Sequence, residues 1–535
     1  MDNFFRPSPL LENTRPKFEI QKTPVRRPFL YLIAFTAGFV SLGVELSASR
    51  LLDPWFGNSI LVWASLIALI LLYLSVGYWL GGRVADRHPQ ARVLLTLTGM
   101  AAFLVGLTPV FARPILRMTA GVFQVFDAAI LLGAFVAVLL LFAAPVILLG
   151  MVSPFIIRLL VAGSEDAGRV SGNVYALSTA GSILGVFAPV LLLIPNIGTR
   201  RTFIVLGMLL LGLSALGLAR IARWRALALG VAWGALAALL LWPSAPIHVE
   251  PDTVYEQESL YNYIRVVRNG PEMLLKLNEG AGVHSVYRPD MLLADGIWDA
   301  FLIAPYFAPA PVHPEDVQRM LIIGLAGGTV AKLASLAYGP IPIDGVELDP
   351  AIIETGRRYF DMTESNLRPV AQDGRYFLNH GAGRYDFIVI DAYRPPYIPF
   401  HLTTVEFFAE VAAHLTSNGV VAINIGRTAD DYALVDALAA TMAQVFPSVF
   451  VLDEVDSGEG LGNSLVVATR RPASLDDFRA NTTALPEPIL AEIARRYAPH
   501  ARLAPSDGPI LIDDKSPIEQ IVHGVIMRYL AAMSN

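Results

Sequence analysis

The 535-residue sequence contains no cysteine, which excludes disulfides, thiolate metal ligands and cysteine nucleophiles. Charge is also scarce, because Asp, Glu, Lys and Arg make up 16% of the residues, against about 25% in ordinary globular proteins. The net charge of −6 gives no sign of the clustered basic face that nucleic-acid binding needs, so we expect no nucleic-acid partner. No metal site is expected either. The residues in excess are hydrophobic, at 54%.

The hydrophobic excess lies in the first half of the chain. Charged residues are rare from Pro28 to Pro243 and return at ordinary density from Ile247 onward. A helix needs roughly 20 apolar residues to cross a bilayer. The sequence therefore predicts a cytoplasmic tail (1–28) and an α-helical multi-pass membrane domain (29–244) whose partner is the lipid bilayer. Seven segments are candidates for the spans: Phe29–Leu51, Ile60–Gly82, Val93–Phe111, Ala128–Ile157, Val174–Ile194, Phe203–Leu218 and Ala226–Trp242.

Basic residues that flank these segments bear on their orientation. They are concentrated before the first segment and after the second, fourth and sixth, including Arg83, Arg87, Arg92, Arg220, Arg223 and Arg225. Cytoplasmic loops carry the excess of Lys and Arg, so the N-terminus is predicted to be cytoplasmic. We expect the second half of the chain on the cytoplasmic face of the cell membrane as well, where nucleotide-type ligands are available. Seven full crossings from a cytoplasmic N-terminus would instead place the second half outside the cell. Either one segment is therefore re-entrant, for which the fourth is the main candidate, or the number of segments is wrong by one.

Two charged residues, Glu45 and Arg50, lie within the first segment. Charges inside a membrane are costly and are functional candidates for that reason. The two side chains either have a structural role, in which they extend toward one end of the span or pair with each other across a helical turn, or they bind a substrate or lipid.

The second half is predicted to fold as a small β subdomain (245–305) followed by an α/β domain (306–535). Short apolar runs separated by Asn-Gly and Glu-Gly turns indicate the β strands. From "RMLIIGLAGG" onward, strand and helix patterns alternate, which indicates a mostly parallel, Rossmann-like sheet with helices on both faces.

Ligands on such sheets lie at the carboxyl ends of the strands. "GLAGG" places Gly324, Gly327 and Gly328 in a turn before a helix, where the backbone can approach a ligand closely. Glu347 ends the next strand, at the usual distance for a carboxylate that binds ribose hydroxyls.

Two more strand ends carry acidic residues. Asp373 and Gly374, in "QDG", follow a short third strand, so that a carboxylate could meet an adenine amine. Asp391 ends the fourth strand. Its side chain is either directed toward the crevice at the strand ends, or it only caps the following segment. Acidic residues on three successive strand ends predict a binding crevice rather than a solvated surface.

With these residues in place, the second half resembles the spermidine synthase (polyamine aminopropyltransferase) family. The likeness runs from about Val254 to Phe450 and includes "ESLYNYIRVV", "LIIGLAGGT", "GVELDPAIIETGRRYF", "QDGRYFL", "RYDFIVIDAY" and "NGVVAINI". "GGRVADR" after the second segment resembles the bacterial subgroup in which this domain is fused to a multi-pass membrane module. The fold implied is the class I methyltransferase and spermidine synthase type.

The resemblance implies an enzyme that transfers the aminopropyl group of decarboxylated S-adenosylmethionine to an amine such as putrescine. The adenosyl sulfonium would be a co-substrate rather than a tightly bound cofactor, and a homodimer is possible. By position, Glu347 would hold the ribose and Asp373 would hold the adenine. Tyr261 would line the amine channel. Asp391 would accept the proton of the attacking ammonium, since an ammonium must be deprotonated before it is a nucleophile.

Parts of the family pattern that bind the amine are altered. The glycine turn lacks the family's acidic residue, and Arg394 stands where the family has a second aspartate. Of an Asp-Glu pair only Asp295 is present, in "ADG". Two alternatives therefore stay open: a membrane-bound S-adenosylmethionine-dependent methyltransferase acting on a lipid or amphiphile, and a transporter-like protein with an adenosyl-sensing domain.

Overall fold

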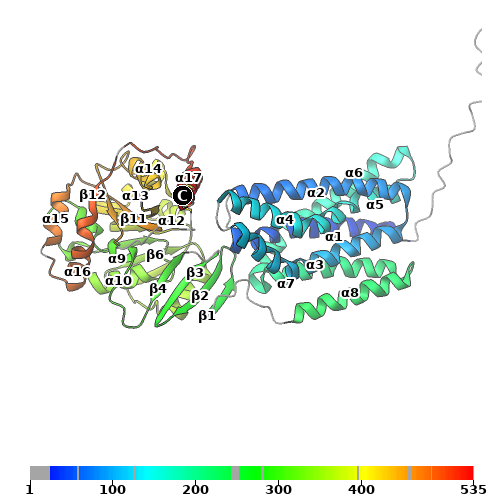
Figure 1. Ribbon diagram of the computed structural model, residues 1–535, viewed down its shortest axis with the longest axis horizontal. Helices are drawn as coiled ribbons and strands as arrows, with labels where there is room; N and C mark the ends of the chain where they lie inside the picture. Colours follow the sequence, from blue (N-terminus) through cyan, green and yellow to red (C-terminus); the bar gives the residue numbers. More distant parts are fainter. Residues whose placement is uncertain are drawn as a thin grey trace, which may run out of the picture.

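The computed structural model describes residues 25–56, 60–123, 127–242, 252–278, 282–393, 397–455, 461–483, 485–505 and 507–533. The chain forms a long helical bundle and an α/β domain that lie end to end (Figure 1). A small antiparallel sheet of the α/β domain faces the end of the bundle.

The bundle is built from eight described helices, with one short π-helical turn (Pro189–Leu193) between the sixth and seventh. The expected fourth segment is interrupted at Met151, between α4 and α5, three residues before Pro154. The helices are α1 (Arg27–Phe56), α2 (Ile60–Arg87), α3 (Ala91–Phe123), α4 (Asp127–Gly150), α5 (Val152–Leu160), α6 (Ser164–Ala188), α7 (Ile194–Leu218) and α8 (Arg223–Leu241).

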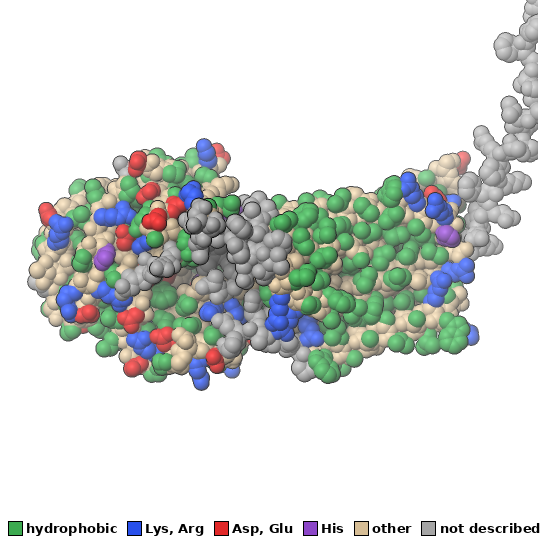
Figure 2. All heavy atoms as spheres, viewed as in Figure 1, with side chains coloured by type: hydrophobic (Ala, Val, Ile, Leu, Met, Phe, Trp, Pro, Cys, Tyr) green, Lys and Arg blue, Asp and Glu red, His purple; other side chains and the backbone are tan. Residues whose placement is uncertain are grey.

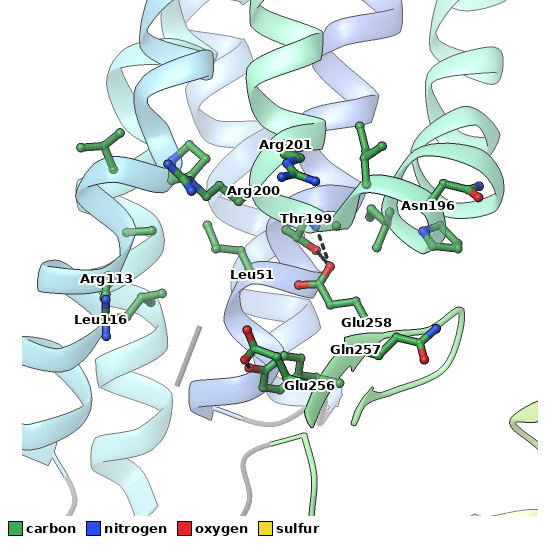
Figure 3. A pocket seen from close by; sticks show the side chains of 18 of the residues that line it. Leu51, Arg113, Leu116, Asn196, Thr199, Arg200, Arg201, Glu256, Gln257 and Glu258 are labelled. Atoms are coloured by element: carbon green, nitrogen blue, oxygen red, sulfur yellow. Dashed lines mark hydrogen bonds between the residues drawn. The ribbon is translucent and has the colours of Figure 1, made fainter. Parts of the chain in front are cut away.

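Six helices among the described residues are long and apolar enough to cross a membrane. One of them, Ser164–Leu218, has 55 residues, more than twice the roughly 20 that a bilayer requires. The helix is broken inside at Gly198, where φ is +79°, a value that few residues other than glycine adopt. Figure 3 shows the two halves running away from this break in the same direction. The fifth and sixth expected segments are therefore the two arms of one folded-back helix, and the described residues make seven passages along the bundle.

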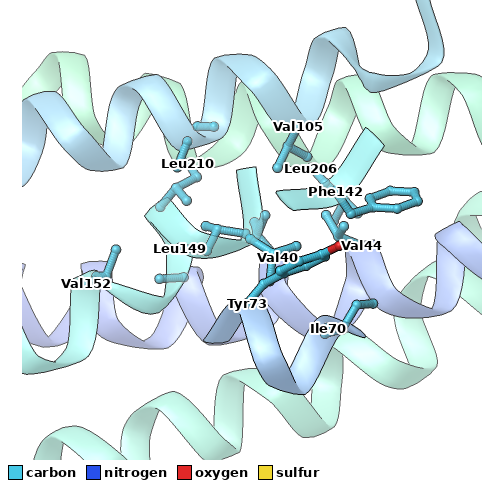
Figure 4. Packing of buried hydrophobic residues seen from close by; sticks show 14 of the residues in the cluster. Val40, Val44, Ile70, Tyr73, Val105, Phe142, Leu149, Val152, Leu206 and Leu210 are labelled. Carbon is cyan, nitrogen blue, oxygen red and sulfur yellow. The ribbon is translucent and has the colours of Figure 1, made fainter. Parts of the chain in front are cut away.

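The bundle helices approach one another closely at glycines. A Cβ on Gly181 of α6 would lie 1.9 Å from the carbonyl oxygen of Phe35 in α1, and one on Gly38 would lie 2.1 Å from that of Ser178. Away from these contacts, interlocking aliphatic and aromatic side chains such as Val40, Phe142 and Leu206 fill the interior (Figure 4). Small residues at helix contacts and large ones between them are typical of membrane bundles.

The two ends of the bundle differ. The first helix begins at the end far from the α/β domain, whereas α8 leads into that domain (Figure 1). Lys and Arg side chains flank a broad hydrophobic belt at both ends (Figure 2), and the far end carries the arginines around the α2–α3 and α7–α8 connections. An odd number of passages therefore separates the arginine-rich end from the α/β domain. If all seven passages cross the membrane, the N-terminus and the second half cannot both be cytoplasmic, as the sequence predicted.

The small subdomain is a four-stranded antiparallel sheet in the order β1-β2-β3-β4. Its strands are β1 (Thr253–Glu258), β2 (Tyr263–Asn269), β3 (Glu272–Leu277) and β4 (Val283–Tyr287). Arg50 of α1 donates hydrogen bonds to the carbonyls of Leu260 and Tyr261, and Glu258 accepts one from Thr199. Arg50 therefore joins the subdomain to the bundle rather than pairing with Glu45.

The α/β domain has an eight-stranded sheet in the order β12-β10-β11-β9-β8-β5-β6-β7. Strands β7, β6, β5, β8 and β9 are parallel, and β11 and β12 run antiparallel to their neighbours. The chain order reverses between β5 and β8, which is where α/β sheets open to ligands. The strands are β5 (Met320–Ile323), β6 (Ile343–Glu347), β7 (Leu367–Ala371), β8 (Tyr385–Ile390), β9 (Leu415–Thr428), β10 (Ser448–Asp453), β11 (Leu461–Thr469) and β12 (Ala501–Leu503).

Helices cover both faces of this sheet, and two buried hydrophobic clusters fill the layers between. The helices are α9 (Ile297–Phe301), α10 (Thr329–Tyr338), α11 (Pro350–Tyr359), α12 (Gly374–His380), α13 (Val405–Ala413), α14 (Ala433–Met442), α15 (Leu475–Thr483), α16 (Pro488–Tyr497) and α17 (Ile518–Met533). The expected Rossmann-like architecture is the one observed.

Candidate active site

Asp391 lies directly after β8, beside the point where the sheet order reverses. Its backbone N–H donates to the carbonyl of Ile323 at 2.8 Å, which continues the pairing of β8 with β5. Its Oδ1 accepts a hydrogen bond from Asn424 Nδ2 at 2.9 Å, and its Oδ2 accepts one from Trp298 Nε1 at 3.1 Å. The carboxylate is therefore held in one orientation by two side-chain donors.

Burial raises the pKa of Asp391 to about 6, and the hydrogen bonds from Asn424 and Trp298 act in the opposite direction. A carboxylate with this pKa is largely ionised at neutral pH, yet it binds a proton more readily than an exposed aspartate does. The site therefore has a group suited to accept a proton from a bound amine.

Asp391 faces a cavity of about 530 Å³. One part of its wall is polar and contains Trp298, Asn424 and His284. Another part is aliphatic and is formed by α14, β11 and α17, with Leu434, Leu461, Val522, Val525 and Ile526. The cavity can enclose a molecule that presents a polar group to Asp391 and an apolar portion to the helices.

Two buried polar atoms in this wall have no hydrogen-bond partner: Asn424 Oδ1 and His284 Nε2. Burial lowers the pKa of His284 to about 4, so its ring is neutral near pH 7. The unpaired Asn424 Oδ1 beside the Asp391 carboxylate is unfavourable unless a ligand donates a hydrogen bond to it. An amine bearing several N–H groups satisfies that requirement.

Asn424, Trp298 and His284 were not predicted from the sequence. Asn424 lies in β9, the parallel strand next to β8, so the rule that ligands bind at strand ends could have found it. Trp298 and His284 come from α9 and β4 and reach the site only through tertiary packing, for which the local sequence has no signal.

The glycine turn after β5 is shaped by close contacts within the protein. Gly324 and Gly328 both have φ of +91°. A Cβ on Gly324 would lie 2.4 Å from the carbonyl oxygen of Asp391, so this glycine allows the ends of β5 and β8 to meet. Gly327 packs against Ser285 of β4 and donates its N–H to the Ser285 hydroxyl at 2.8 Å.

Glu347, at the end of β6, is bound to this turn. Its Oε2 accepts the N–H of Ala326 at 2.9 Å, and its Oε1 accepts the N–H of Asp349 at 3.1 Å. Burial raises the pKa of Glu347 to about 7, while the two backbone hydrogen bonds oppose that rise. A carboxylate that is already oriented and can still accept further hydrogen bonds suits a diol such as ribose.

Asp373 begins α12, next along the sheet edge. Its carboxylate accepts the N–H of Tyr376 at 2.9 Å and lies 3.0 Å from His401 Nε2. A Cβ on Gly374 would lie 2.3 Å from Ile323, so the start of this helix packs directly on β5. Asp373 therefore caps its helix while it remains partly exposed at the strand ends.

The structure places the predicted residues on either side of the point where the sheet order reverses. The glycine turn, Glu347 and Asp373 follow β5, β6 and β7, on one side of the reversal point. Asp391 and its cavity follow β8, on the other side. A ligand bound across the turn can therefore present one end to Asp391.

Two of the three candidate substrate-binding residues, Tyr261 and Asp295, lie away from the Asp391 cavity. Tyr261 does not line the Asp391 cavity, and its carbonyl accepts a hydrogen bond from Arg50 at 3.1 Å. Asp295 forms ion pairs with Arg496 at 3.1 Å and Arg288 at 3.5 Å, outside the cavity wall. Arg394 lies outside the described residues.

Comparison with known proteins bears on the identity of this site. The model of the spermine/spermidine synthase domain matches residues 308–452. A polyamine aminopropyltransferase of Vibrio vulnificus is 32% identical over 222 residues, which cover 39% of this chain and 71% of the relative. The chain belongs to the spermidine synthase family.

A probable polyamine aminopropyl transferase of Bifidobacterium longum is 30% identical over 285 residues, covering 50% of this chain and 62% of that relative. Among solved structures, a probable spermidine synthase of Corynebacterium glutamicum aligns with a TM-score of 0.38 and 19% identity, covering 51% of this chain and 97% of the other. A spermidine synthase in complex with the transition state analogue AdoDATO has the same TM-score and identity, covering 46% and 85%. Membership of a transferase family agrees with the expectation from sequence.

Proposed function

We propose that the protein transfers an aminopropyl group from decarboxylated S-adenosylmethionine to an amine acceptor. The observation that carries this proposal is the buried Asp391 carboxylate, oriented by Trp298 and Asn424 at the edge of a cavity. The names of the relatives support the same reaction class.

In the proposed reaction, the acceptor nitrogen attacks the propyl carbon next to the sulfonium. A carbon–nitrogen bond forms, the carbon–sulfur bond breaks, and its electron pair neutralises the sulfur of the departing methylthioadenosine. The proton that the nitrogen loses passes to the Asp391 carboxylate. The sulfonium is a good leaving group, so alignment of the two reacting atoms supplies much of the acceleration.

The adenosyl part of the co-substrate would bind over the glycine turn. Glu347 would accept hydrogen bonds from the ribose hydroxyls, and Asp373 would accept one from the adenine amine. The co-substrate is consumed in each turnover, so no tightly bound cofactor is part of the proposal. A homodimer remains an expectation from the family alone.

The acceptor amine would be bound by Asp391 together with the unpaired Oδ1 of Asn424. Putrescine is the acceptor that the family suggests. Tyr261 and Asp295 do not line the described cavity, so they have no direct contact with the acceptor in this proposal.

We further propose that the bundle is embedded in the cell membrane and that the α/β domain faces the cytoplasm. The hydrophobic belt and the six apolar helices support insertion. The cytoplasmic face is proposed because adenosyl sulfonium compounds are made in the cytoplasm. This orientation places the arginine-rich end outside, against the usual charge bias, so the topology requires its own test.

The reaction is tested with full-length protein purified in detergent. The protein is given putrescine with either decarboxylated or intact S-adenosylmethionine, and both adenosyl products are quantified by chromatography. We expect methylthioadenosine from the decarboxylated compound only. Asp391→Asn should lower kcat/KM by about 10²–10⁴-fold, because it removes the proton acceptor.

The matched control is Asp476→Asn, an exposed aspartate on α15, which should leave kcat/KM unchanged. Formation of S-adenosylhomocysteine from intact S-adenosylmethionine with a lipid acceptor would instead identify a methyltransferase. Binding of the adenosyl compounds without turnover of any amine or lipid would favour a sensor.

A further inference from the structure

A second cavity, of about 610 Å³, lies between the end of the bundle and the β subdomain (Figure 3). Its walls come from α1, α3, the fold-back at Gly198, α8 and the edge strand β1. It shares no described lining residue with the Asp391 cavity. The proposed transfer reaction therefore does not account for it.

Three arginines line this cavity: Arg113 from α3, and Arg200 and Arg201 from α7. All three side chains are half-buried. The Nε of Arg113 is buried without a hydrogen-bond partner. Among the described residues, neither Arg113 nor Arg201 forms an ion pair with a carboxylate. Unpaired guanidinium groups in a half-buried wall are unfavourable unless an anion neutralises them.

The two glutamates in the cavity already accept hydrogen bonds from other groups. Glu258 Oε2 accepts the N–H of Thr199 at 2.5 Å and its hydroxyl at 2.8 Å, and burial raises the pKa of Glu258. Glu256 accepts a hydrogen bond from the Tyr263 hydroxyl. Figure 3 shows both glutamates on the β1 side, with Arg200 and Arg201 on the helix side. Positive charge therefore predominates at the helix side of the cavity.

The remainder of the wall is mostly apolar and belongs to the bundle helices. Leu51, Trp55, Leu116, Leu239 and Trp242 line it. Tryptophan is enriched where membrane helices meet the headgroup layer. An occupant of this cavity therefore has an anionic head and an apolar remainder that can lie along the helices.

We propose that this cavity binds the phosphate headgroup of an anionic membrane phospholipid. Guanidinium groups match phosphate oxygens with two parallel N–H donors, and basic pockets between membrane helices bind such headgroups. The inference rests on the proposed membrane insertion, but not on the identity of the transferred group.

A lipid bound here would contact both the bundle and the β subdomain. It would bridge α3 and α7 and lie against β1, next to the bonds that Arg50 and Thr199 make with the subdomain. The bound lipid is therefore expected to stabilise the attachment of the α/β domain to the bundle.

The experiment uses full-length protein, delipidated in detergent and then titrated with dioleoyl phosphatidylglycerol, dioleoyl phosphatidylcholine or inorganic phosphate. Affinity is measured by the shift in melting temperature and by native mass spectrometry. The variant Arg113→Gln/Arg201→Gln removes two cationic groups from the cavity. Arg117→Gln is the matched control, because Arg117 is exposed one turn further along α3 and does not line the cavity.

We expect phosphatidylglycerol to bind the wild-type and Arg117→Gln proteins equally, and the double variant about tenfold or more weakly, since charged hydrogen bonds are lost. Phosphatidylcholine should bind less well than phosphatidylglycerol. If the double variant does not fold, Arg113→Lys is used in its place. This variant keeps the positive charge but loses the two parallel N–H donors, so its affinity for phosphatidylglycerol should fall by a smaller factor. Equal affinity of the double variant and wild type, or equal stabilisation by inorganic phosphate alone, would overturn the proposal.

Discussion

At the scale of single residues, the Trp298 indole is one of two hydrogen-bond donors that oppose the effect of burial on the pKa of Asp391. Its Nε1–H stabilises the ionised carboxylate, so it lowers a pKa that burial raises to about 6. Trp298→Phe removes this donor while it keeps an aromatic ring. The Asp391 pKa should then rise by about one unit or less, the value of one hydrogen bond. Because the base acts when deprotonated, the acidic limb of the kcat/KM profile should move to higher pH.

Trp224→Phe is the control for that profile, because Trp224 is 84% exposed on α8. Its pH dependence should match that of the wild type. An acidic limb that stays in place in Trp298→Phe would mean that Asp391 does not act as the base.

Glu347 provides the second test at this scale. Its pKa of about 7 means that the carboxylate gains charge as the pH rises through 7. An ionised carboxylate is the stronger hydrogen-bond acceptor, so methylthioadenosine should bind more tightly above pH 7 than below it. Glu347→Gln should weaken binding by about tenfold or more and remove the pH dependence, as measured by calorimetry. Glu354→Gln, an exposed change on α11, should preserve both, and a pH-independent wild type would contradict the role of Glu347.

At the scale of elements, the contact between α1 and α6 depends on glycine. A Cβ on Gly181 would lie 1.9 Å from the Phe35 carbonyl oxygen, which is backbone and cannot rotate away. Gly181→Ala should therefore force the helices apart and cost about 1–3 kcal/mol, seen as a lower melting temperature in detergent. Gly172→Ala, on the same helix with nothing within 4 Å of its Cβ position, should not destabilise the protein. Equal melting temperatures for the two variants would show that α1 and α6 pack differently.

The same scale explains what could be predicted from sequence. Glu347, Asp373 and Asp391 were predictable as candidates because each lies at the carboxyl end of a strand, and parallel strands bring those ends together. The break at Gly198 lies between the fifth and sixth expected segments, where Arg200 and Arg201 interrupt the apolar pattern, although the positive φ itself has no signal in the sequence. The positions of Tyr261 and Asp295 depend on which partners bind them. Arg50 binds the carbonyl of Tyr261, and Arg288 and Arg496 pair with Asp295; of these, Arg50 and Arg496 are distant in sequence.

At the scale of the whole molecule, the odd number of helical passages along the bundle predicts which introduced cysteines a thiol reagent can reach from outside the cell. The loop between α2 and α3 lies at the end opposite the α/β domain, so the two must lie on opposite sides of a membrane that all passages cross. Single cysteines are informative because the natural sequence has none. His88→Cys and Ser474→Cys, both at exposed positions, should therefore react oppositely with a membrane-impermeant thiol reagent in intact cells.

The proposed cytoplasmic catalytic domain requires labelling at position 88 and protection at position 474 until the cells are permeabilised. The arginine-rich loops favour the reverse orientation by charge alone, but large domains follow the charge bias less strictly than short loops do. Labelling at position 474 with protection at position 88 would place the Asp391 cavity outside the cell, where an adenosyl sulfonium made in the cytoplasm would have to be exported. Equal accessibility of both positions would mean an even number of crossings, with one passage, such as the α4–α5 segment interrupted at Met151, entering and leaving on the same side.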